Sequence, residues 1–135
     1  MISTAEEFYR LRTSDNPQEY NRAATEEAPL EVWQHVIKQY PEMKKWVAHN
    51  KTVPIEILET LSRDPDVEIR SMVAMKRKLT EEMQMRLAED ETYSVRNLLV
   101  HNGKATEKVL RKLAEDKEEA IRNRARERLK NKQSR

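Results

Sequence analysis

The sequence predicts an all-α protein, a right-handed α-solenoid in which short helix pairs stack on one another. The main observation is an internal repeat of 26 residues that sets 54–79, 80–105 and 106–131 in register. The composition agrees, because the 135 residues include a single glycine and are dominated by good helix formers such as Ala, Leu, Met, Glu, Lys and Arg. A period of this length is typical of helical units that each complete the apolar face of a neighbour.

The N-terminal part is predicted to hold a capping helix in 1–15 and divergent first units in 16–53, with one or two residues missing from the repeat. Ser3 followed by Glu6 fits a capping box at the start of the first helix. Prolines at helix starts and apolar stripes predict the further short helices. The apolar residues of this part are Phe8, Leu11, Val32, Trp33, Val36, Ile37, Trp46 and Val47. Both tryptophans are expected in the core.

Each regular repeat is predicted to contain two helices that start at polar caps. Thr80 and Thr106 are expected to cap first helices, and Asp64, Asp90 and Asp116 are expected to cap second helices. Apolar residues at helical spacing are then expected to face the core. These are Ile57, Leu58, Leu61, Ile69, Met72, Val73, Met83, Leu87, Val95, Leu98, Leu99, Val109, Leu110, Leu113, Ile121 and Ala125.

The last repeat is predicted to end the stack with a polar face. It has Arg124 where the earlier repeats have Met72 and Leu98, and Arg126 and Arg128 follow. A terminal repeat has no successor to pack on, so its outer face must be polar.

The spacing of aspartate and arginine resembles that of short HEAT-like repeats, whose second helix opens with an aspartate followed by a β-branched residue and arginine. Similarity to leucine-rich repeat variants is seen in the segment VAHNKTVPIEILETLSRDPDVEIR, and the likeness covers roughly 20–130. The resemblance implies a ladder that links successive repeats. Its members are Asp64, Arg70, Asp90, Arg96, Asp116 and Arg122. Exposed pairs contribute only about 0.2–1 kcal/mol each, so the ladder is expected mainly to set the register.

Several classes of site are excluded by residue content and spacing. Without cysteine there is no disulfide, thiolate metal site or cysteine nucleophile, and the iron–sulfur cluster of some leucine-rich repeat variants has no ligands. His49 and His101 are two repeats apart, about 20 Å for layers spaced 8–10 Å, too far for one metal ion. Catalytic triads, paired carboxylates and phosphate loops are also absent. We therefore expect a non-enzyme without cofactor or metal.

The chain is expected to be a soluble, cytoplasmic protein that does not bind membranes. Its first residues lack the apolar region of a secretory signal. No stretch approaches the ~20 apolar residues that a membrane span needs.

In HEAT-like solenoids the second helices line the concave side. The resemblance therefore implies that the solvent-facing residues of the second helices are candidates for binding a partner. The strip is polar and mixed in charge, which favours a protein or peptide partner, and Met75 adds an adaptable apolar contact. A merely solvated face remains an equal interpretation. The predicted partner-binding residues are Lys45, His49, Ser71, Met75, Asn97, His101 and Asn123.

Nucleic-acid binding is the alternative hypothesis. Basic residues recur at the tips between repeats, and 117–135 holds eight bases against three acids, where 1–31 holds three bases against seven acids. The candidate phosphate ligands, joined by the arginines of the last helix, are Lys51, Lys76, Arg77, Lys78 and Lys104. Glutamates interleave with these bases and the net charge is only +2, which argues against it. A small bacterial adaptor fits best, and a toxin-neutralising immunity protein would have the same pattern.

Overall fold

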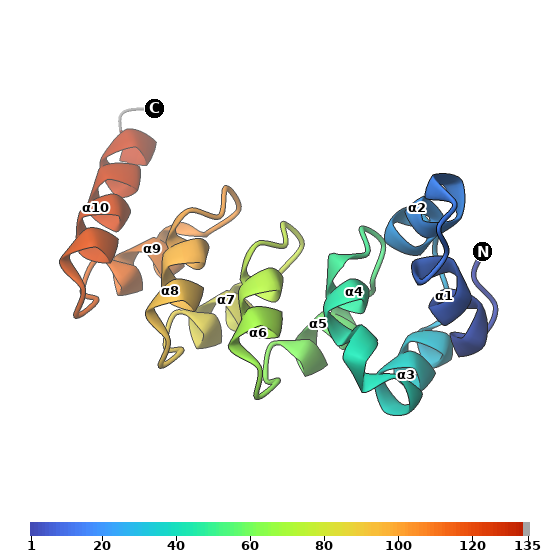
Figure 1. Cartoon of the computed structure of the whole chain (residues 1–135). Helices are drawn as coiled ribbons and strands as arrows, with labels where there is room; N and C mark the ends of the chain where they lie inside the picture. The colour runs from blue at the N-terminus through green and yellow to red at the C-terminus, as the bar shows by residue number, and fades with distance from the viewer. Residues whose placement is uncertain (134–135) are drawn as a thin grey trace. The chain divides into compact units, whose positions relative to one another are not determined.

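The computed structural model describes residues 1–133, and every regular element in that range is a helix (Figure 1). The prediction of an all-α protein is thereby confirmed for these residues. The chain divides into two compact units, Met1–Asp64 and Pro65–Arg135, here named the N-terminal unit and the C-terminal unit. The boundary falls inside the predicted repeat 54–79, so the two helices of that repeat belong to different units. None of the helices in residues 1–133 is long and apolar enough to cross a membrane.

The N-terminal unit packs five α-helices and a 3-10 turn around two aromatic rings. Phe8 and Trp33 are fully buried and meet edge to face, with ring centroids 5.3 Å apart. The first helix contacts the second and third, as expected for a helix that covers this end of the core. The elements are α1 (Ala5–Arg12), α2 (Pro17–Thr25), α3 (Leu30–Gln39), η1 (Pro41–Met43), α4 (Lys44–His49) and α5 (Ile55–Leu61).

The N-cap of helix α1 lies one residue later than predicted. The N-cap is Thr4, whose hydroxyl accepts from the backbone N–H of Glu7 at 3.0 Å. Ser3 instead donates its backbone N–H to the Glu7 carboxylate at 2.7 Å. The pairing of Ser3 with Glu6 is therefore wrong: the cap bond joins Thr4 and Glu7, and the Glu7 carboxylate accepts from the residue before the cap instead of from the cap residue itself.

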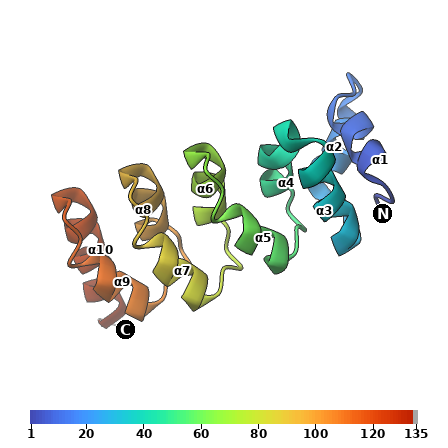
Figure 2. The ribbon, with the colours of Figure 1, turned by 90° about the horizontal axis from the view of Figure 1, so that it is seen from below.

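The C-terminal unit forms two rows of helices. Helices α6, α8 and α10 contact one another in sequence, and α7 contacts α9 in the other row. The two views of the ribbon agree on these rows (Figures 1 and 2). The elements are α6 (Val67–Ala74), α7 (Glu81–Leu87), α8 (Tyr93–Val100), α9 (Glu107–Leu113) and α10 (Glu119–Gln133).

Most of the predicted apolar stripes are buried, but one column is not core. Met72 and Leu98 are half-buried, as is Arg124, which follows them in the repeat. Trp46, in the same column of the N-terminal unit, is also half-buried, so its assignment to the core is wrong. With 100° between successive helical residues, this column lies about 60° from the buried Ile69 and its equivalents, at the edge of the stripe.

Thr80 and Thr106 cap their helices as predicted, through hydroxyls that accept from backbone N–H groups three residues on. The aspartates that were predicted as caps, Asp64, Asp90 and Asp116, do not cap the second helices. The N-cap of α6 is Asp66 and that of α8 is Thr92. Asp90 and its equivalent Asp116 lie in the turn before the helix, where Oδ1 accepts a backbone N–H two residues on at 3.0 and 2.9 Å. Their other carboxylate oxygen is thus available to a second partner.

Candidate functional sites

The aspartates and arginines of the predicted ladder form buried ion pairs. Arg70 Nε lies 2.9 Å from Asp90 Oδ2, and Arg96 Nε lies 2.9 Å from Asp116 Oδ2. Only 4% of the Arg96 side chain and 6% of the Asp116 side chain are exposed. The expectation that these pairs are exposed is therefore wrong for these members.

The two ends of the ladder differ from its middle. In the N-terminal unit, Lys44 Nζ pairs with Asp64 Oδ2 at 2.9 Å. In the last repeat, Arg122 donates to the backbone carbonyl of Asp116 at 2.9 Å and no carboxylate pairs with it among the described residues. These side chains therefore stabilise the turns of the structure.

A second ladder of buried polar residues was missed by the sequence analysis. Asn102 donates through Nδ2 to the carbonyl oxygens of Ala74 and Lys76 at 2.9 and 2.8 Å, which ties it to the end of the previous second helix. Asn50 makes an equivalent pair of bonds in the N-terminal unit, and Arg128 makes one in the last repeat. The sequence held one signal for this second ladder: an asparagine, Asn50 or Asn102, follows each of the two aligned histidines.

The predicted outer cap of the last repeat is wrong for one of its three arginines. Arg126 is exposed and Arg124 is half-buried. Arg128 points back into the molecule, where its Nη1 donates to the Val100 and Asn102 carbonyl oxygens at 2.9 and 2.7 Å. It occupies the repeat position of Asn102, so its longer side chain serves the same carbonyl-bridging role.

The C-terminal unit brings together five of the predicted partner-binding residues. They occupy equivalent positions on the side-by-side helices α6, α8 and α10, or at their ends. Met75 is 54% exposed, His101 and Asn123 are exposed, and Ser71 and Asn97 are half-buried. We call these five residues the second-helix face.

Lys45 and His49, the other two predicted partner-binding residues, lie in the N-terminal unit around Trp46. Each is 6.0 Å from the indole ring, Lys45 through Nζ and His49 through its ring centroid. Arg12 stacks its guanidinium on the same ring at 3.4 Å. A pocket of about 60 Å³ between α1, α2 and α4 is lined by Arg12, Tyr20, Ala23, Ala24, Trp46 and His49. This volume exceeds the roughly 10–15 Å³ that a single water molecule needs, so the pocket can hold water.

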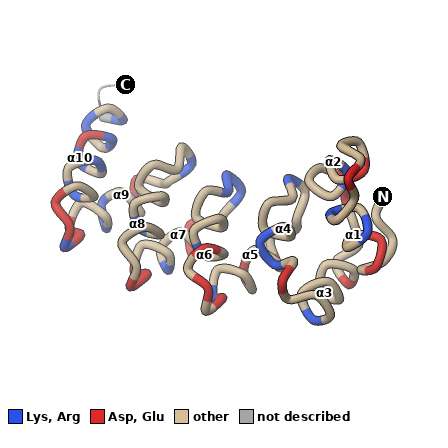
Figure 3. The backbone as a smooth tube through the Cα atoms, in the orientation of Figure 1, with Lys and Arg blue, Asp and Glu red and all other residues tan. Residues whose placement is uncertain are grey.

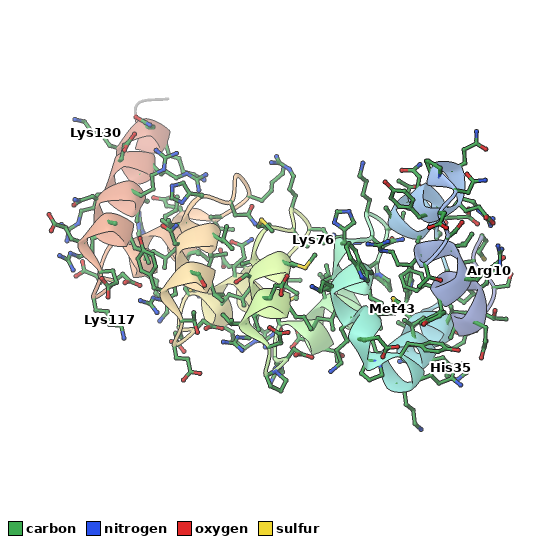
Figure 4. All side chains as sticks on the ribbon, in the orientation of Figure 1. Arg10, His35, Met43, Lys76, Lys117 and Lys130 are labelled. Carbon is green, nitrogen blue, oxygen red and sulfur yellow. The ribbon has the colours of Figure 1, made fainter. Side chains whose placement is uncertain are left out.

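The basic residues of the predicted edge differ in exposure. Arg77, Lys78 and Lys104 are exposed, as is Lys51 in the N-terminal unit. Lys76 is half-buried (Figure 4), and burial, with a smaller contribution from the charge of Lys78, lowers its pKa to about 8. Lys76 is therefore the poorest phosphate ligand of the set, because near pH 8 it is only partly charged.

Charge is segregated within the C-terminal unit. Basic residues occupy the turns after α6 and α8, and acidic residues occupy the turns before α6, α8 and α10 (Figure 3). This pattern complements the helix dipole, which favours anions at helix starts and cations at helix ends. A basic edge of this kind stabilises the helices even without a ligand.

A larger cavity lies between α10 and the turn that precedes α9. Its volume is about 400 Å³ and it is lined by Gly103, Arg124, Arg128, Asn131 and Lys132. The three cations recur every four residues and therefore share one side of α10. Burial, together with the nearby charge of Arg124, lowers the pKa of Arg128. The i, i+4, i+8 spacing of the three cations and the single glycine could be read from the sequence. That the cations and Gly103 line one cavity could not.

No group of three or more potential metal-ligating side chains comes together in the described part of the chain. Comparisons with protein-family models, curated proteins and solved structures give no match for this sequence.

Proposed function

We propose that the protein is a short, right-handed α-solenoid of HEAT-like helix pairs that binds another protein or a peptide without catalysis. The binding surface is the second-helix face. The observation that carries this proposal is an apolar group on that face: Met75 is 54% exposed and lies beside the half-buried Met72, and the half-buried Leu98 is on the neighbouring helix. The repeat pattern and the alternation of first and second helices support the solenoid.

The composition of the face fits a protein partner better than a phosphate backbone. Its polar members, Ser71, Asn97, His101 and Asn123, include no Lys or Arg, whereas phosphate binding relies on these residues. An apolar centre with a polar rim is the usual anatomy of a protein interface. Methionine also adapts its shape to different apolar partners.

The test compares two variants with equal changes in charge. Met75→Glu combined with Asn97→Glu lowers the net charge by two on the second-helix face, and Lys108→Glu lowers it by two on the exposed surface of α9. We expect a discrete protein captured from lysate to bind the wild type and the α9 variant but not the face variant, with similar thermal melts for all three. Binding that survives in the face variant would exclude this surface. The identity of the captured protein would decide whether it is a toxin, as for an immunity protein, or another target.

Nucleic-acid binding is the second candidate function, supported by the exposure of Arg77, Lys78 and Lys104 at one end of the C-terminal unit. It predicts that affinity for a duplex falls steeply with salt. Replacing Lys78 and Lys104 by Ala should lower the salt slope by about one unit for each phosphate that is no longer neutralised. A flat salt dependence would exclude it.

A further inference from the structure

The cavity beside α10 concentrates positive charge, of which the described residues neutralise only a part. None of its five lining residues is acidic. Glu127 lies 3.2 Å from Arg124 Nη1, in an ion pair whose side chains are 40% (Arg124) and 61% (Glu127) exposed. Arg124 Nε is shielded from solvent and has no hydrogen-bond partner in the described chain. The site therefore has cations and donors in excess.

Gly103 provides space for a further cation at the margin of the cavity. The earlier repeats have Lys51 and Arg77 at this position. The backbone of Gly103 does not have a positive φ, so the turn itself does not require glycine. A Cβ at this position would lie 3.1 Å from Arg77 Nη1. The absence of a side chain therefore lets the Arg77 guanidinium lie directly over the backbone.

We propose that this cavity binds the phosphate group of a phosphate monoester, at a site separate from the second-helix face. Arg124 and Lys132 would contact the phosphate oxygens, with Arg77 at the margin. Asn131, which is exposed, is placed to donate a neutral hydrogen bond. A monoester carries up to two charges and three strong acceptor oxygens, which match several cations that line one cavity.

The geometry separates the ligand-binding residues from those that hold the fold. Arg128 uses Nη1 to bridge two backbone carbonyl groups, so its removal would damage the last repeat. Lys132 has only a long contact of 3.4 Å to the Ala105 carbonyl oxygen. Arg124 and Lys132 are therefore the informative positions for substitution. The pKa of Arg128 is lowered first by burial and then by the charge of Arg124, and a bound anion would counteract the repulsion between these two cations.

The experiment titrates inorganic pyrophosphate into the full chain at low salt by calorimetry. The site variant is Arg124→Ala with Lys132→Ala. Its control, Arg126→Ala with Lys117→Ala, removes the same charge from exposed positions, one on another side of α10 and one in the turn before it (Figure 4). We expect the site variant to raise Kd at least about tenfold, because two charge-assisted bonds are removed, and the control to leave it within about twofold.

A second arm identifies the source of the phosphate, using a short single-stranded oligonucleotide with and without a 5′-phosphate. Tighter binding of the phosphorylated form, abolished in the site variant, would support the proposal. Absence of pyrophosphate binding to the wild type would overturn it, as would equal weakening in the site variant and the control. Oligonucleotide binding that ignores the 5′-phosphate and persists in the site variant would also overturn it, and would assign the affinity to the basic turns.

Discussion

Removal of Arg96 tests whether the ladder stabilises the fold or only sets its register. Its guanidinium makes two bonds: Nε to Asp116 Oδ2 at 2.9 Å and Nη1 to the Asp90 carbonyl oxygen at 2.8 Å. In Arg96→Ala the Asp116 carboxylate, which is 6% exposed, loses its ion-pair partner while it stays buried. Loss of one member of a buried pair costs about 3–5 kcal/mol, well above the ~1 kcal/mol limit for an exposed pair.

The chain offers a matched control at the next position of the same column. Arg122 also donates to a carbonyl oxygen six residues earlier, at 2.9 Å, but no carboxylate pairs with it in the described structure. Arg122→Ala therefore removes the same side chain and the same backbone bond without breaking an ion pair. Its expected cost is about 1.5–3 kcal/mol, the value for one hydrogen bond that involves a charged group.

Urea denaturation followed by far-ultraviolet circular dichroism measures both losses. Both variants lose the same backbone bond, so the difference between them is that of the broken ion pair, about 3–5 kcal/mol, and it should appear as a lower midpoint with an unchanged slope for Arg96→Ala. Equal losses would refute the argument, because they would mean that the ion pair contributes nothing beyond the backbone bond. The double variant Arg96→Met, Asp116→Leu should recover much of the loss, since an apolar pair leaves no buried charge without a partner.

Three further outcomes follow from individual side chains. Asn102→Ala should cost about 2–3 kcal/mol in urea denaturation, because two carbonyl groups lose their donor, whereas Asn97→Ala, whose amide makes no such bond, should cost less than about 0.5 kcal/mol. The pKa of Glu26 is lowered to about 2, first by the hydrogen bond from Arg22 and then by that from the N-terminal ammonium. The stability that Glu26 contributes is therefore present above its unfolded pKa of 4.5 and is lost as pH falls towards 2. Glu26→Gln should flatten the stability curve in that window, and an unchanged curve would contradict the assignment. The folded pKa of Lys76 is about 8, against 10.5 when unfolded, so between these values the unfolded chain binds more protons and stability rises with pH. In Lys76→Met this rise of stability with pH should be absent, and its persistence in the variant would show that other groups cause it.

Local patterns predicted the helices well because their causes lie within a few residues. Thr80 and Thr106 cap helices through their own hydroxyls. Leu87 and Leu113 lie on the apolar face of their helices, opposite the polar residues, and this position predicts their burial. Errors arose where two local solutions compete. Asp90 was predicted as an N-cap, but a cap two residues later at Thr92 leaves the aspartate free to bond the turn and Arg70.

The candidate sites were harder to predict because they depend on neighbouring repeats. Trp46 lies at the edge of an apolar stripe, and only packing decides whether an edge residue is covered; here Arg12 stacks on its ring. Gln84 occupies the column of Leu58 and Leu110, yet it is 2% exposed. Its amide is satisfied by carbonyl groups that include that of Lys104, 20 residues away.

The sequence by itself determined the helical class, the repeat and most of the buried apolar positions. These depend on periodicity and capping, which act over one or two helical turns. Only the tertiary structure decided which polar and charged residues are buried. Arg96, Asn102 and Arg128 look like surface residues in the chain, but each reaches a carboxylate or carbonyl group that the adjacent repeat places beside it. A polar side chain stays buried only where such a partner offsets its lost hydration, and the partner's position is set by packing between repeats.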